Sequence, residues 1–230
     1  MVDRNIEEHY KKNGNTNLIT NSGLKNNAQI YAIGDSHTIF FHNSMKIYEH
    51  WGWDGRIPLT LYTFGNTNMN IYNVGNLLGN GHEKYNIKKN DYVIFYYGYN
   101  DVQRRFYSNF NNDTENNISI LVDKYINKIL MLKNEYQIIP IIPCIYPLPI
   151  KFTGMNIMGS DEERINYTQI TNKLLESKCK ENSILFLNIY DDISINDKIN
   201  EKYTVDGIHL DYNNSEIRDL VEIKIYELIM

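Results

Sequence analysis

The chain contains a serine, a histidine and an aspartate whose types and positions suit nucleophilic catalysis. A serine hydroxyl is a weak nucleophile at neutral pH and needs a base within hydrogen-bonding reach, which a histidine side chain can provide. Ser36 is the candidate nucleophile and His209 the candidate base. Asp206, three residues before His209, could orient the imidazole and stabilise its cation. This set predicts acyl transfer through a serine triad.

The three residues lie in short sequence blocks that each follow a predicted strand or precede the last helix. The blocks are Gly-Asp-Ser-His at 34–37, Gly-Tyr-Asn-Asp at 98–101 and Asp-Gly-Ile-His at 206–209. One such block alone is weak, because Gly-Asp-Ser after a strand is also ordinary turn and helix-cap chemistry. Three in this order resemble the SGNH (GDSL-like) hydrolase superfamily, and the resemblance spans about residues 30–210. It implies a catalytic triad of Ser36, Asp206 and His209.

The resemblance also implies an oxyanion hole, whose donors are typically worth a few kcal/mol each. The family pattern assigns this role to the backbone N–H of Ser36, to Asn100 and to a glycine of a further block. Gly65 is the favoured glycine because it directly follows a predicted strand. Gly75 and Gly79 remain alternatives, although they lie within or at the end of a predicted helix.

Three neighbouring residues are candidates for substrate binding. His37 departs from the leucine common in the family and could touch substrate, but a histidine on a helix face is more often structural. Asp101 could contribute to binding or tie loops together. Arg104, followed by Arg105, could meet a carboxylate or phosphate, or simply lie at a solvated helix start.

Alternating apolar runs and amphipathic segments indicate the fold that positions these blocks. Strands are predicted at about 29–33, 58–64, 91–97, 137–145 and 184–187. Helices are predicted at about 37–50, 68–78, 118–132, 160–180 and 214–229. The third has an apolar stripe along one face, and Ser160 followed three residues later by Glu163 is a capping-box pattern that opens the fourth. This alternation favours an α/β fold, a three-layer α/β/α sandwich around a five-stranded, mainly parallel sheet. In such sheets, ligands bind beyond the carboxyl ends of the strands, where the blocks fall.

The chain reads as one catalytic domain with a polar extension. Residues 1–27 are rich in Asn and Lys without sustained periodicity and are expected to form an N-terminal arm. Residues 28–230 are expected to form a single domain, which could belong to a longer protein because the last helix has no stop signal. The segment 146–159, with Pro147 and Pro149, is predicted to be a long loop, and long loops are often functional.

Composition argues against several classes of partner. The net charge of −5 does not suit nucleic-acid binding, which needs clustered Lys and Arg. The sequence has no apolar run of about 20 residues and no apolar stretch near the N-terminus, so we expect a cytoplasmic protein without membrane contact. The two cysteines are expected to be inert core thiols, and the six histidines show no metal-ligand spacing. No metal site and no tightly bound cofactor are predicted.

The three blocks predict the nucleophile but not whether the acyl group passes to water or to another acceptor. Heavy use of Asn, Ile, Lys and Tyr is typical of an AT-rich genome, and the Gly-Asp-Ser-His block is similar to those of sugar-modifying SGNH domains of large DNA viruses and bacteria. This similarity favours acetyl transfer from acetyl-CoA, as cosubstrate, to a sugar or nucleotide-sugar. Hydrolysis of carbohydrate O-acetyl or lipid esters is the alternative. A catalytically silent carbohydrate-binding or scaffold module is the alternative from another class.

Overall fold

The computed structural model describes residues 28–41, 87–105, 114–151 and 159–229. Within them, four parallel strands form one sheet in the order of the chain: β1 (Ile30–Gly34), β2 (Tyr92–Tyr96), β3 (Ile139–Pro143) and β4 (Leu185–Leu187). Every residue of β1 and β2 is buried, as expected for strands covered on both faces. Four of the five predicted strands are therefore confirmed. The fifth, at 58–64, lies outside the described residues.

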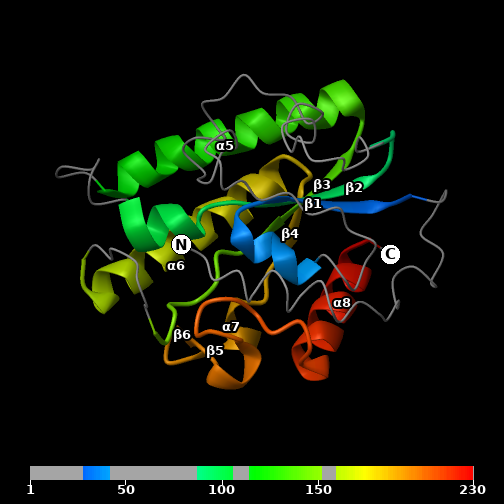
Figure 1. Ribbon diagram of the computed structural model, residues 1–230. Coiled ribbons are helices and arrows are strands. Elements are labelled where there is room, and N and C mark those ends of the chain that lie inside the picture. Colours follow the sequence, from blue (N-terminus) through cyan, green and yellow to red (C-terminus); the bar gives the residue numbers. More distant parts are fainter. Residues whose placement is uncertain (1–27, 42–86, 106–113, 152–158, 230) are drawn as a thin grey trace, which may run out of the picture.

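Helices cover the sheet from both sides. α5 (Thr114–Tyr136) packs against α6 (Asp161–Glu181), and α8 (Ser215–Ile229) contacts β4. α5 lies on one side of the strands and α8 on the other (Figure 1). The capping box predicted for α6 is present, because Glu163 donates its backbone N–H to the Ser160 hydroxyl and accepts from the Ser160 backbone. The three-layer α/β/α sandwich is confirmed.

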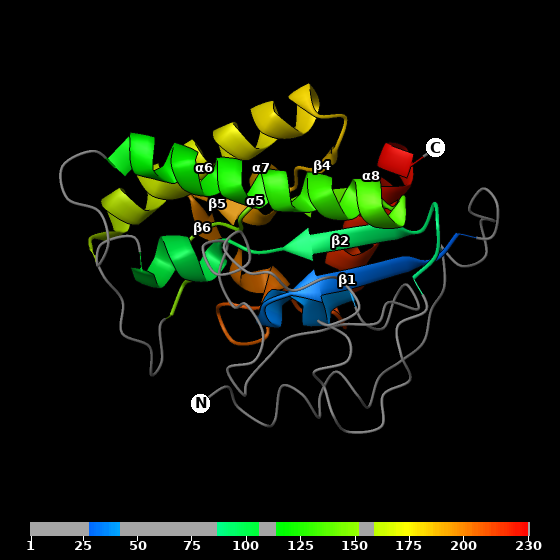
Figure 2. The same cartoon turned by 90° about the horizontal axis from the view of Figure 1, so that it is seen from above.

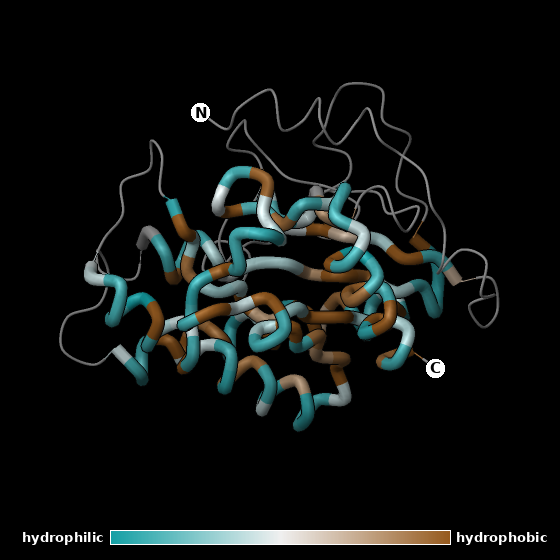
Figure 3. The backbone as a smooth tube through the Cα atoms, turned by 90° about the horizontal axis from the view of Figure 1, so that it is seen from below, coloured by the Kyte–Doolittle hydropathy of each residue, from teal (hydrophilic) through white to brown (hydrophobic). Residues whose placement is uncertain are grey.

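Tyrosine side chains fill much of the core. The largest fully buried side chains include Tyr96, Tyr97, Tyr125 and Tyr146, and the Tyr125 hydroxyl donates to the carbonyl of Phe95 at 2.9 Å. Figure 3 shows the hydrophobic stretches gathered in the middle of the molecule, with hydrophilic segments on its outer turns. Buried tyrosines need a partner for the hydroxyl, and this one has a strand carbonyl. These tyrosines thus serve packing, not a surface for stacking sugars.

The two cysteines also belong to the interior. Cys144 and Cys179 are both buried and free. Burial raises the pKa of each thiol to about 12, so both stay protonated at neutral pH. The prediction of inert core thiols is confirmed.

The carboxyl ends of the strands lead into short irregular helices. β1 and β2 lie side by side with their arrowheads pointing the same way, toward η2 (Ser36–Phe41) and η3 (Asp101–Arg105) (Figure 2). η2 begins the helix predicted at 37–50, of which the remainder lies outside the described residues, and η3 is a single π-helical turn. Both helices therefore begin at the edge of the sheet where ligands bind in this architecture.

The segment between β4 and α8 carries several short elements that the sequence did not predict. They are α7 (Tyr190–Ile193), the antiparallel pair β5 (Ser194–Ile195) and β6 (Lys198–Ile199), and η4 (Glu201–Tyr203). Leu148, in the predicted loop 146–159, forms a bridge with Lys198. This connection ties the segment after β3 to the segment that precedes the third sequence block.

Candidate active site

The structure brings the predicted triad together. The Ser36 hydroxyl lies 2.9 Å from Nε2 of His209, although the two residues are 173 positions apart in the chain. Nδ1 of the same imidazole lies 2.7 Å from Oδ2 of Asp206. Each ring nitrogen thus has one partner, which is the arrangement a histidine needs to take a proton from serine while a carboxylate fixes its orientation.

Close contact between β1 and β2 fixes the nucleophile turn. A Cβ on Gly34 would lie 2.1 Å from the carbonyl oxygen of Tyr96, so only glycine fits at the end of β1. The next backbone N–H, that of Asp35, donates to the same carbonyl at 3.1 Å. The Asp35 carboxyl then accepts the backbone N–H of His37 at 3.0 Å. Ser36, half-buried, is held between these two anchored residues.

The loop that carries the base is held by its own aspartate. Oδ1 of Asp206 accepts the backbone N–H groups of Ile208 at 2.9 Å and of His209 at 2.7 Å, and Oδ2 accepts from the imidazole. Gly207 between them has φ +87°, a backbone conformation that favours glycine. The Asp-Gly-Ile-His block is therefore a compact unit that presents base and orienting carboxylate together.

Electrostatics keep the orienting carboxylate charged. Burial alone would raise the pKa of Asp206, but the hydrogen bonds and the charge of His209 outweigh burial and hold the pKa well below its usual range. Asp206 is ionised at neutral pH in consequence. It can stabilise the imidazolium that forms when His209 takes the serine proton.

Asn100 lies beside the nucleophile turn, as the second block predicts. Its side-chain amide donates to Oδ2 of Asp35 at 3.2 Å. This contact orients the side-chain amide relative to the nucleophile turn. Gly98, with φ +117°, provides the turn between β2 and this residue. Gly65, the favoured third oxyanion donor, and its alternatives Gly75 and Gly79 lie outside the described residues.

Sequence reasoning missed the buried carboxyl of Asp35. Its side chain accepts from both His37 and Asn100, and burial raises its pKa to about 8, with the charge of Asp101 acting in the same direction. The two hydrogen bonds lower the pKa without offsetting burial. Asp35 thus links the nucleophile turn to Asn100 as a largely protonated acid at neutral pH. Its position between Gly34 and Ser36 in the first block was the available signal.

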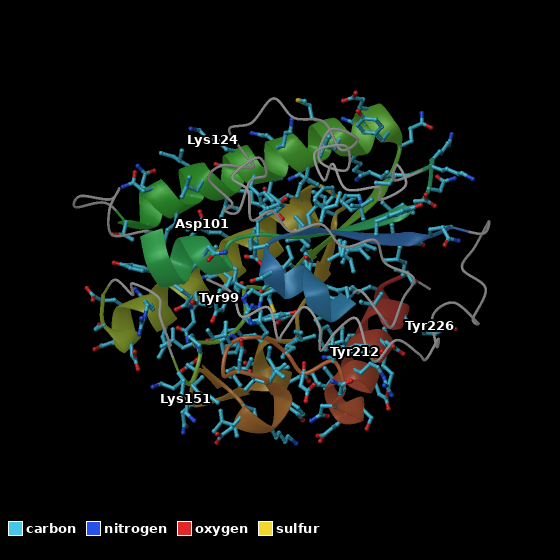
Figure 4. All side chains as sticks on the ribbon, in the orientation of Figure 1. Tyr99, Asp101, Lys124, Lys151, Tyr212 and Tyr226 are labelled. Carbon is cyan, nitrogen blue, oxygen red and sulfur yellow. The ribbon has the colours of Figure 1, made fainter. Side chains whose placement is uncertain are left out.

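Two of the three predicted substrate-binding residues, His37 and Asp101, have side chains that the structure describes. His37 is 3% exposed, and its ring centroid lies 4.8 Å from that of His209. Asp101, 2% exposed, is the first residue of η3 and follows Tyr99 by two positions (both labelled in Figure 4). Arg104 belongs to η3, but its side chain lies outside the described part of the chain. Their contact with substrate stays a prediction.

Comparison with known families decides the class. A family model for GDSL-like lipases and acylhydrolases matches residues 30–214. The chain belongs to this family. With its triad in place, it is an enzyme of the serine-esterase type, and the resemblance inferred from the three blocks is confirmed. No curated protein shows significant similarity to this sequence.

Solved structures agree on the fold. A proposed acylhydrolase from Bacteroides fragilis is similar with a TM-score of 0.54 and 16% identity, covering 98% of this chain and 94% of the other. A GDSL-like lipase from Bacteroides thetaiotaomicron is similar with a TM-score of 0.53 and 16% identity, covering 97% and 96%. At such low identity, the similarity establishes the fold alone.

In the part of the chain that the structure describes, no helix has the length and apolar character needed to cross a membrane. The same residues contain no group of three His, Cys, Asp or Glu side chains placed to hold a metal ion.

Proposed function

We propose that this enzyme hydrolyses carboxylic esters with short acyl groups, with O-acetylated carbohydrate as the expected substrate class. The observation that carries the proposal is the continuous line of hydrogen bonds from Ser36 through His209 to Asp206. Membership of the acylhydrolase family supports hydrolysis. The choice of a carbohydrate substrate rests on the similarity of the first block to those of sugar-modifying domains. We propose a small-molecule or carbohydrate partner, no tightly bound cofactor and a cytoplasmic location.

The geometry supports the usual two-stage reaction of a serine esterase. The Ser36 hydroxyl attacks the ester carbonyl carbon while its proton passes to Nε2 of His209, 2.9 Å away. The tetrahedral intermediate then collapses, the alcohol leaves with the proton from His209, and an acyl-Ser36 ester remains. Water attacks this ester with His209 again as base, which releases the acid and restores the serine.

Asn100 is the proposed side-chain donor to the oxyanion. Its amide is oriented by Asp35, whose backbone also forms the nucleophile turn, so the donor and Ser36 are held by one residue. A donor fixed before the reaction costs no reorganisation when the negative charge develops. The Ser36 backbone N–H and Gly65 complete the proposed set.

Acetyl transfer from acetyl-CoA, the first expectation from the sequence, needs an acceptor held against the acyl carbon and water kept away. We propose the long loop predicted at 146–159 as the source of that cover, and the structure describes it only at 146–151 and at 159. Family membership favours water as the acceptor, so hydrolysis is the main proposal. A catalytically silent module is disfavoured because every member of the triad has its hydrogen-bonding partner.

One experiment tests both directions. The protein is incubated with p-nitrophenyl acetate and acetylated sugars, and separately with acetyl-CoA plus amino sugars and nucleotide-sugars, and acetyl groups are followed by mass. We expect release of acetate from the esters by the wild-type protein and none by Ser36→Ala. Acetylated sugar formed from acetyl-CoA would establish the transferase instead. If Ser36 reacted with no ester and with no fluorophosphonate label, the protein would be the catalytically silent module instead of an enzyme.

A further inference from the structure

His37 lies directly after the nucleophile, and its ring is buried among four other rings. Its centroid lies 4.1 Å from that of Tyr99, 5.3 Å from Tyr96 and 5.5 Å from Tyr146. The fourth neighbour is His209, at 4.8 Å with an angle of 36° between the ring planes. The side chain thus touches the catalytic base on one side and three tyrosines on the others.

The tyrosines around His37 come from the structural framework. Tyr96 ends β2, and Tyr146 follows β3, with its backbone N–H donating to the Tyr96 hydroxyl at 3.3 Å. Tyr96 and Tyr146 are also in direct ring contact, at 4.8 Å. Tyr99 lies just before η3, at the carboxyl end of β2 (Figure 4). The tyrosines that pack against His37 therefore belong to the sheet and to the segments that directly follow β2 and β3.

Packing, not hydrogen bonding through Nδ1, holds the His37 ring. Nδ1 of His37 is buried without a hydrogen-bond partner among the described residues. The backbone of His37 is fixed separately, by the hydrogen bond of its N–H to Asp35. A ring anchored on one side by its backbone and on the other by tyrosines has few positions available.

The His37 ring is uncharged and lies beside the His209 imidazole, which must become charged during the reaction. The groups that face it are Tyr96, Tyr99, Tyr146, His209 and Asp206, with Asp35 at its backbone. Burial, and then the charge of His209, hold the pKa of His37 well below its usual range, with Asp206 acting weakly in the opposite direction. His37 consequently stays neutral when His209 takes up the serine proton, and no like charge opposes that step.

We propose that His37 is a positioning residue for this reaction: its ring is the surface against which the His209 imidazole rests between the Ser36 hydroxyl and Asp206. The inference rests on the proposed esterase function. It assigns His37 an action through His209, which differs from both the substrate contact and the purely structural role that the sequence allows. A misplacement of a catalytic group by about 1 Å can cost up to a hundredfold in rate, so this support affects turnover more than substrate binding.

The test compares two ring-size variants with a packing control. His37→Phe keeps a flat ring, His37→Leu removes it, and Phe40→Leu removes from the same short helix a buried ring that contacts Phe41. The readouts are kcat and KM for p-nitrophenyl acetate and the melting temperature. A third readout is the downfield proton NMR signal of the His209 Nδ1–H, which reports the 2.7 Å bond to Asp206.

We expect His37→Phe to stay within about threefold of wild type in kcat, and His37→Leu to fall about tenfold with unchanged KM. The NMR signal should broaden or vanish in His37→Leu only. Phe40→Leu should lower the melting temperature but keep kcat and the signal. If either His37 variant raises KM with kcat unchanged, or if His37→Leu matches wild type, the proposal is overturned. A wild-type protein inactive on all esters would refute the esterase, and the NMR signal alone would then decide on His37.

Discussion

The buried carboxyl of Asp35 should make the stability of this enzyme fall as pH rises. Its pKa lies at about 8 in the folded protein, against 3.8 for an ordinary aspartate, because burial disfavours the charged form. A group whose pKa is raised by folding stabilises the folded protein fully while the pH lies below the pKa of that group in the unfolded chain. The stabilisation is lost as the pH rises from the pKa in the unfolded chain to the pKa in the folded protein. The loss should therefore develop between about pH 4 and pH 8.

The size of the effect follows from the proton difference between the two states. Between pH 5 and pH 7, the unfolded chain has released the Asp35 proton while the folded protein retains it. Each pH unit then costs about 1.4 kcal/mol of unfolding free energy, or about 3 kcal/mol over this interval. Replacing Asp35 with a residue that does not titrate should abolish this dependence of the unfolding free energy on pH.

Asp35→Asn is the matching perturbation, because asparagine has nearly the same shape and does not titrate. The substitution places an amide against the Asn100 amide that now donates to Asp35, which adds a cost that does not vary with pH. Urea unfolding at pH 5, 6 and 7 should show the difference between wild type and Asp35→Asn shifting by about 3 kcal/mol in favour of the variant as pH rises. The pH dependence that comes from His37 is common to both proteins and cancels.

An exposed carboxyl provides the control. Glu162→Gln, on the first turn of α6, should follow the wild-type slope. If wild type and Asp35→Asn lost stability in parallel between pH 5 and pH 7, Asp35 would already be ionised in the fold. The inference of a neutral acid beside the nucleophile would then be wrong.

Four single substitutions and one double variant test the remaining steps. Ser36→Ala and His209→Ala should each abolish most turnover in ester hydrolysis assays with the melting temperature preserved. The double variant should be no less active than either single variant, since the two residues act as a unit, and additive losses would contradict the triad. Asn100→Ala should lower kcat about a hundredfold with little change in KM, and a raised KM with normal kcat would make Asn100 a binding residue instead. Gly34→Ala should destabilise the fold by about 3 kcal/mol or more, measured by urea unfolding, because its Cβ would lie 2.1 Å from the Tyr96 carbonyl; near-wild-type stability would show that the strands separate easily.

The elements predicted best from the sequence are those with a long periodic signal. The apolar stripe of α5 and the capping box of α6 identify helices whose buried faces the structure confirms. β1 and β2 are continuous apolar runs, as strands covered on both faces should be. By contrast, β5, β6 and η4 have only two or three residues each, too few for any period to be visible.

The site divides in a similar way. The sequence predicts Ser36, Asp206 and His209 as a triad because each role needs a particular residue type at a fixed position in a block, and the structure places the three within hydrogen-bonding distance. The burial of Asp35 and the ring contacts of His37 were not, because both depend on which side chains from other strands lie nearby. Sequence patterns report which chemistry is present, whereas the surroundings that shift a pKa or hold a ring arise only when the sheet forms.

The way the base loop attaches to the sheet explains how residues 173 positions apart meet within hydrogen-bonding distance. Gly207 accepts the backbone N–H of Ile150 at 3.0 Å, and the backbone of Lys151 lies 3.3 Å from the place a Cβ on Gly207 would occupy. The segment after β3 therefore holds the loop, and β3 pairs with β2, which in turn pairs with β1 and its nucleophile turn. Each link is a backbone contact, so the register of three parallel strands sets the distance between Ser36 and His209. A side chain at Gly207 would press on the backbone of Lys151, so the placement of His209 depends on the position of the segment that follows β3.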